Sequence, residues 1–150
     1  MGRSAYLFTI ASSMTLSVFL SEPSFCQVDP SVQDPNAINH DYTLQRYAVG
    51  GKKSIFSNYY SLKMDCCPSD WMDVKLTKSP ENGEAKLVEM MTQANYNAPN
   101  PRVKCNGKSV KSTALQYTPH KGYVGSDSIE VEMINTAGQR NTYTYNITVK

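Results

Sequence analysis

The sequence predicts an all-β fold, an antiparallel β-sandwich of about seven short strands. Two observations predict it. Apolar and polar residues alternate in most segments after residue 41, with the period of two that is typical of antiparallel strands with one buried face. Turn-forming residues separate these segments, and the whole chain contains 8 Gly and 8 Pro.

The predicted strands follow one another along the chain. They cover residues 42–49, 54–64 (one or two strands), 71–78, 84–92, 114–118, 128–134 and 142–150. The alternation is clear in 128–134, where Ile129 and Val131 would face inward and the alternate glutamates outward. Residues 84–92 include several helix-favouring side chains, but their place between strands favours a strand.

Length and charge limit the classes of function. The chain has 150 residues, which fits a single domain. It carries 15 Lys and Arg against 13 Asp and Glu, a formal net charge of +2. A nucleic-acid partner would call for a clustered basic face, and a polybasic membrane anchor for a basic run. We expect neither.

The N-terminal residues have the layout of a secretory signal peptide. Arg3 is followed by an apolar stretch up to Leu20, and Pro23 breaks the pattern. A membrane anchor is the alternative, but the stretch is diluted by Ser and Thr, and a spanning helix needs about 20 apolar residues. With cleavage after Cys26, we expect a signal peptide at 1–26, a flexible leader at 27–41 and one domain at 42–150. The domain would be exported to the periplasm or the exterior, with no transmembrane anchor.

Export would place the domain in an oxidising compartment, where disulfides persist. After cleavage, Cys66, Cys67 and Cys105 remain. We expect a disulfide between Cys67 and Cys105, because Pro68 fixes the chain beside Cys67, with Cys66 as the alternative to Cys67. A bridge between the two adjacent cysteines would be strained. The third thiol would be buried or available to a partner, and the spacing does not fit a zinc site.

Residues 115–150 carry the most specific motif. It reads Tyr117-Thr118-Pro119-His120-Lys121-Gly122-Tyr123-Val124-Gly125-Ser126-Asp127-Ser128. This stretch resembles the Tyr-x-Pro-x-x-Gly-(Phe/Tyr)-x-Gly-x-Asp-Ser element of bacterial cadherin-like and immunoglobulin-like domains, which occur in large surface and biofilm proteins. With the strand and turn at 74–83, the resemblance covers about residues 74–150. It implies an immunoglobulin- or cadherin-like sandwich in a small exported single-domain member, and an adhesion-like role.

The motif also has a structural explanation that needs no ligand. Tyr117 would pack between the sheets, and Pro119 would end its strand without needing a ladder donor. Gly122 and Gly125 permit turn conformations that other residues resist. Tyr123 would close the end of the sandwich.

Asp127 is the acidic residue of the motif. We expect it to accept backbone N–H bonds and so to hold the corner before the next strand. Calcium at Asp127 is the alternative. Calcium takes six to eight oxygen ligands, and the loop offers no second acidic residue, so the structural role is favoured.

No catalytic constellation stands out. The Gly-x-Ser-x-Gly element is absent, and no base lies near Cys66 and Cys67 in the sequence. We therefore expect no enzymatic activity, no cofactor and no metal. A small carbohydrate-active or hydrolytic protein is the alternative, with Asp70, Asp73 or Glu89 as its acidic groups.

Tyr59, Tyr60 and Trp71 are candidates for a sugar-stacking or protein-binding surface. Adjacent residues on a strand point to opposite faces, so one of the two tyrosines must belong to the core. A tryptophan beside a disulfide is typical of a sandwich core. The leading hypothesis is a non-enzymatic module that binds a protein or glycan partner at the cell envelope. A structural subunit that exchanges an edge strand is a further alternative.

Overall fold

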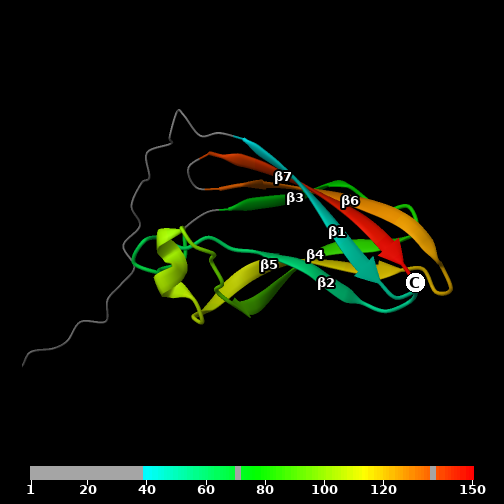
Figure 1. Ribbon diagram of the computed structural model, residues 1–150, viewed down its shortest axis with the longest axis horizontal. Coiled ribbons are helices and arrows are strands. Elements are labelled where there is room, and N and C mark those ends of the chain that lie inside the picture. The colour runs from blue at the N-terminus through cyan, green and yellow to red at the C-terminus, as the bar shows by residue number, and fades with distance from the viewer. Residues whose placement is uncertain (1–38, 70–71, 136–137) are drawn as a thin grey trace, which may run out of the picture.

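Two β-sheets share one core and make up the fold (Figure 1). The computed structural model describes residues 39–69, 72–135 and 138–150. These ranges hold seven strands: β1 His40–Ala48, β2 Ser54–Tyr59, β3 Asp73–Lys78, β4 Gly83–Gln93, β5 Ser109–Pro119, β6 Gly125–Ile134 and β7 Arg140–Val149. A 3-10 helix, η1 (Pro101–Cys105), follows β4, and the described ranges contain no α-helix.

The predicted all-β class and the strand count are confirmed. β5 is longer than predicted, because residues 109–113 continue the ladder with β4. β1 begins at His40, inside the predicted leader at 27–41. Residues 1–38 lie outside the described residues, and they include the predicted signal peptide at 1–26 and most of that leader.

The strand order is β1-β7-β6-β3 in one sheet and β2-β5-β4 in the other. All pairs are antiparallel except β1 with β7, which is parallel over nine rungs from His40↔Asn141 to Ala48↔Val149. The prediction of a wholly antiparallel fold is therefore wrong at this pair. Alternation along a strand shows which side chains face inward, but it carries no information on the direction of the neighbouring strand.

The main core lies between the two sheets and is rich in aromatic rings. Its fully buried members include Leu115 and Tyr117 from β5, Ile129 from β6, and Tyr145 from β7. More buried residues alternate with more exposed ones along most of β5, β6 and β7, as the period of two in the sequence indicates. Ile129 and Val131 of β6, which the sequence predicts to face inward, are thus in the core.

β3 accompanies only part of β6, which shapes the outer face of the four-stranded sheet. β3 pairs with residues 130–134 of β6, and its register shifts between Leu76 and Lys78. After Lys78 the chain crosses to the other sheet through residues 79–82 and continues as β4. The first half of β6 therefore has β7 on one side and this crossing turn on the other.

A second, smaller core lies beyond the main one. It contains Leu62, Ala94, Cys105 and Val110. η1 belongs to this region, which lies at one end of the sheets, while the C-terminus lies at the opposite end (Figure 1). Arg102 Nε donates a hydrogen bond to the carbonyl oxygen of Leu62 and so ties η1 to the segment after β2.

The disulfide joins Cys66 to Cys105, with 5.4 Å between the Cα atoms. The preferred prediction of Cys67 is therefore wrong, and its alternative is correct. Cys66 has a positive φ of 69° in a tight turn, and its side chain packs against the second core that contains Cys105. The prediction of Cys67 rests on Pro68, which carries no information on the φ angle of Cys66. No cysteine in the described ranges is a free thiol, so the expected third thiol is not found there.

The disulfide indicates an oxidising environment. Within the part of the chain that the structure describes, no helix has the length and apolar character needed to cross a membrane.

Candidate functional site

Asp127, at the start of β6, ties the two sheets together. Its Oδ1 accepts hydrogen bonds from the backbone N–H of Glu81 (3.0 Å) and Ser128 (2.8 Å). Its Oδ2 accepts from the N–H of Asn82 (3.0 Å) and from the hydroxyl of Tyr117 (2.8 Å). A carboxylate offers about four lone-pair positions, so these donors occupy all of them. Asp127 holds the crossing turn against β6 and leaves no lone pair for a metal ion.

The environment keeps Asp127 ionised. Burial by itself would raise the pKa of its carboxyl, but the hydrogen bonds from Tyr117, Glu81, Ser128 and Asn82 outweigh burial and lower the pKa. The pKa of the Tyr117 phenol is raised, first by burial and then by its hydrogen bond to the charged carboxylate. The pair therefore consists of a carboxylate and a neutral phenol.

The other motif residues lie at the end of β5, in the turn that follows and at the start of β6. Tyr117 is buried between the sheets and Pro119 is the last residue of β5. Gly122 and Gly125 have positive φ values of 78° and 149°. A Cβ on Gly125 would lie 2.7 Å from the hydroxyl oxygen of Tyr123, which donates to the carbonyl of Ser126 at 2.7 Å. Glycine is thus required where the tyrosine side chain folds back over the turn.

A hollow of about 410 Å³ opens on the outer face of the four-stranded sheet, where β3 has left β6. We call it the outer-face hollow. Asp127 and Ile147 form part of its lining, and the remaining residues are polar: Gln45, Glu81, Ser126, Ser128, Asn146 and Thr148. They come from β1, β6, β7 and the crossing turn, which Asp127 holds in place.

The polar side chains of the outer-face hollow are not engaged with other residues. None of these six side chains donates or accepts a hydrogen bond, or forms an ion pair, with another residue of the described ranges. They include two amides, three hydroxyls and one carboxylate. The hollow therefore presents donors and acceptors that remain available to a ligand.

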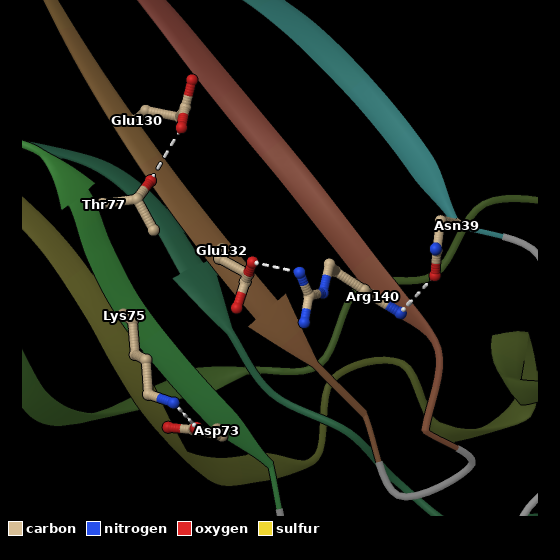
Figure 2. A network of polar contacts seen from close by, with 7 residues as sticks. All are labelled: Asn39, Asp73, Lys75, Thr77, Glu130, Glu132 and Arg140. Carbon is tan, nitrogen blue, oxygen red and sulfur yellow. Dashed lines mark hydrogen bonds and ion pairs between the residues drawn. The ribbon is translucent and has the colours of Figure 1, made fainter.

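The other half of the same face differs, as Figure 2 shows. Thr77 Oγ1 donates to Glu130 Oε1 at 2.9 Å, and Arg140 Nη1 lies 3.3 Å from Glu132 Oε2. Lys75 Nζ lies 2.6 Å from Asp73 Oδ2. Contacts between strands and, for Lys75 and Asp73, within β3 thus occupy the charged groups there.

An exposed aromatic ring flanks the outer-face hollow. Tyr47 is 68% exposed and lies opposite Thr148 in the β1–β7 register. Residues two apart on a strand share a face, so Tyr47 lies on the same side of β1 as Gln45. Lys150 Nζ lies 5.1 Å from the centre of the Tyr47 ring.

Of the three residues predicted to form an aromatic binding surface, Tyr59 belongs to the main core and Tyr60 packs against the second core. Tyr59 is only 5% exposed, and its hydroxyl lies 2.6 Å from that of Tyr145. Tyr60 belongs to the rim of the second core, where its ring packs edge-on against Tyr96. Trp71 lies outside the described residues. A smaller hollow of about 280 Å³ borders both tyrosines.

The acidic residues considered for hydrolysis lie apart in the fold. Asp73 belongs to β3 and pairs with Lys75, whereas Glu89 belongs to β4 in the other sheet, with its Oε1 2.9 Å from Lys111 Nζ. Asp70 lies outside the described residues. The described ranges contain no group of three or more His, Cys, Asp or Glu residues that could hold a metal ion.

Comparisons with known proteins were made for the whole chain. No family model matches it. No curated protein matches it either. A search of solved structures found a chain described as "Structure of PbICP-C in complex with falcipain-2", which is 11% identical, with 79% of this chain and 96% of that chain covered and a TM-score of 0.36. A likeness at this level carries no argument about function.

The outer-face hollow was not among the sites predicted from the sequence. Alternation along 142–150 already places Asn146 and Thr148 on the polar face, and alternation along 42–49 places Gln45 opposite Leu44. What the sequence lacks is any signal that β1 lies beside β7. The hollow exists only because residues from these distant segments meet.

Proposed function

We propose that this chain is an exported, non-catalytic binding module with an immunoglobulin-like sandwich fold, which holds a partner at the bacterial cell envelope or surface. The observation that carries the proposal is the outer-face hollow, with its unengaged polar side chains on paired strands. The signal-peptide layout, the disulfide and the resemblance of the Tyr117–Asp127 corner to surface-protein domains support an exported location.

The chemistry of the lining supports binding over catalysis. A serine nucleophile needs a base within hydrogen-bond reach, and no His, Lys or Cys lines the outer-face hollow in the described part of the chain. Asp127 is fully committed to its four donors. Glu81 is the remaining carboxylate of the lining, whereas glycoside hydrolysis usually requires a pair.

The test is a pull-down from envelope extract with matched variants. Gln45→Ala/Asn146→Ala removes both amides of the hollow, which lie opposite each other in the β1–β7 register. Thr43→Ala/Thr144→Ala changes the register pair two rungs away, which does not line the hollow, and serves as the control. We expect the wild type and the control to recover the same partner, and the amide variant to lose it. Equal recovery by both variants would refute the proposed function.

A further inference from the structure

We propose that the outer-face hollow binds a neutral saccharide, with Tyr47 as a stacking surface at its rim. This inference rests on the proposed binding function and names the ligand class of the same site. It starts from the hydrogen-bonding character of the lining. The amides of Gln45 and Asn146 each donate and accept, and the hydroxyls of Ser126, Ser128 and Thr148 do the same. Sugar hydroxyls also donate and accept, so the two sets are complementary.

The charges around the hollow argue against other ligands. Glu81 is the one charged side chain of the lining that is not engaged, and the described residues that line the hollow include no Lys, Arg or His. A lining with a carboxylate and no cation disfavours phosphate, sulfate and nucleic-acid ligands. A single available carboxylate is also too little for a divalent cation, which takes several oxygen ligands.

The lining also argues against an apolar or protein ligand. Its one aliphatic residue, Ile147, is 2% exposed and belongs to the main core. Protein–protein interfaces have apolar, often aromatic centres. A hollow of amides and hydroxyls lacks such a centre, and a hydroxyl-rich ligand is the class that remains.

Tyr47 supplies an aromatic face beside the polar groups. Its ring is largely exposed and lies next to Thr148 and on the same side of β1 as Gln45. Residues two apart on a strand are about 7 Å apart, which is roughly the length of one sugar ring. The C–H face of a sugar could therefore stack on Tyr47 while the neighbouring ring enters the hollow.

The floor of the site is preorganised. Asp127 fixes the backbone of Glu81 and Asn82, and the β6 and β7 residues belong to the interior strands of the sheet. Preorganised groups lose little conformational entropy on binding, which allows a small polar ligand to bind with useful affinity.

The experiment measures binding of the unreduced protein to immobilised glycans, followed by titration calorimetry with the best soluble binder. The neutral probes are chitin, cellulose, starch and mannan oligosaccharides, and the anionic probes are alginate and heparin. We expect binding to at least one neutral probe.

Gln45→Ala/Asn146→Ala should weaken this binding by about tenfold or more, because it removes two hydrogen-bonding groups. Tyr47→Ala should weaken it by roughly fivefold, whereas Tyr47→Phe, which keeps the ring face, should bind like the wild type. Thr43→Ala/Thr144→Ala should also bind like the wild type.

Each of the other outcomes would refute a specific part of the proposal. Binding to anionic probes alone would refute the neutral class, and binding that none of the hollow or Tyr47 variants changes would refute the site. If no probe binds while the envelope pull-down still depends on Gln45 and Asn146, the saccharide assignment fails and the binding function stands. Circular dichroism of every variant checks that a loss of binding is not a loss of fold.

Discussion

At the scale of single residues, the Asp127 carboxylate is the hydrogen-bond acceptor that the crossing turn and Tyr117 share. It satisfies two backbone amides of the crossing turn and the buried hydroxyl of Tyr117. A buried donor that loses its partner costs about 1–3 kcal/mol. The same contacts set the position of Glu81 at the outer-face hollow. Substitutions at Asp127 should therefore affect folding first and binding as a consequence.

Asp127→Ala should lower the free energy of unfolding by about 3 kcal/mol, because it leaves Tyr117 and the turn amides without an acceptor. Tyr117→Phe removes one of the four donors and should cost only about 1 kcal/mol. Urea unfolding followed by circular dichroism measures both. A loss for Asp127→Ala no larger than that for Tyr117→Phe would contradict the role of Asp127 as the common acceptor.

Asp127 should also give the fold an acid sensitivity. Its pKa in the folded protein lies below the value of about 3.9 in the unfolded chain. The stability it contributes is therefore complete above about pH 4 and is lost as the pH falls through the folded pKa. We expect the stability difference between wild type and Asp127→Asn, measured by urea midpoints from pH 6 to pH 2, to shrink in acid. Parallel curves for the two proteins would rule out this linkage.

At the scale of elements, the shape of the outer face depends on which segment lies beside each strand. β6 has strands on both sides only where β3 accompanies it, and the crossing turn takes over where β3 ends. The outer-face hollow arises at this change of neighbour. At the opposite end of the sheets, η1 and the segment after β2 form the second core, and the disulfide links them. The disulfide therefore supports that end and not the binding face.

The pairing of Cys66 with Cys105 can be tested by two serine variants. In Cys67→Ser, peptide mapping of the unreduced protein should still find Cys105 linked to Cys66. In Cys66→Ser that link should be absent, and the free energy of unfolding should fall by about 3–4 kcal/mol, as the loop-entropy model gives for a loop of this length. The opposite result, with Cys105 linked only in Cys66→Ser, would contradict the structure.

At the scale of the whole molecule, the core between the two sheets contains several tyrosines. Tyr117 and Tyr145 are fully buried, and Tyr59 donates to the hydroxyl of Tyr145, which in turn donates to Ser57 Oγ at 2.7 Å. Tyr143 packs edge-on against Tyr59 and stacks on Tyr42. The phenols of Tyr59, Tyr117 and Tyr145 bring polar atoms into the core, and each of them is hydrogen-bonded: Tyr59 and Tyr145 to each other, and Tyr117 to Asp127.

The tyrosine core should make the protein sensitive to alkali. Burial raises the pKa of Tyr59 and Tyr117, and it raises the pKa of Tyr143 to about 12. An unfolded tyrosine ionises near pH 10, so the stability due to these groups is complete below about pH 10 and is lost as the pH rises toward the folded values. We expect tyrosinate absorbance of the buried rings to appear together with loss of the β signal. Ionisation of all tyrosines near pH 10 in a protein that stays folded would disprove this.

The amino-acid sequence alone predicts the features that depend on neighbouring residues along the chain. Alternation identified the strands, their inward faces and the polar face that includes Asn146 and Thr148. The Tyr117–Asp127 motif indicated a corner, because glycines and an acceptor side chain act locally. These are short-range consequences of backbone sterics and of burying one face of a strand.

Three other features can be seen only in the folded protein. The parallel pairing of β1 with β7, the choice of Cys66 over Cys67 and the outer-face hollow all depend on segments that are distant in sequence. Long-range pairing is selected by the combined packing of the whole core and by the backbone conformation at a few turns, such as the positive φ of Cys66. No local pattern encodes these quantities, because the free energy that selects them is shared among residues from several strands.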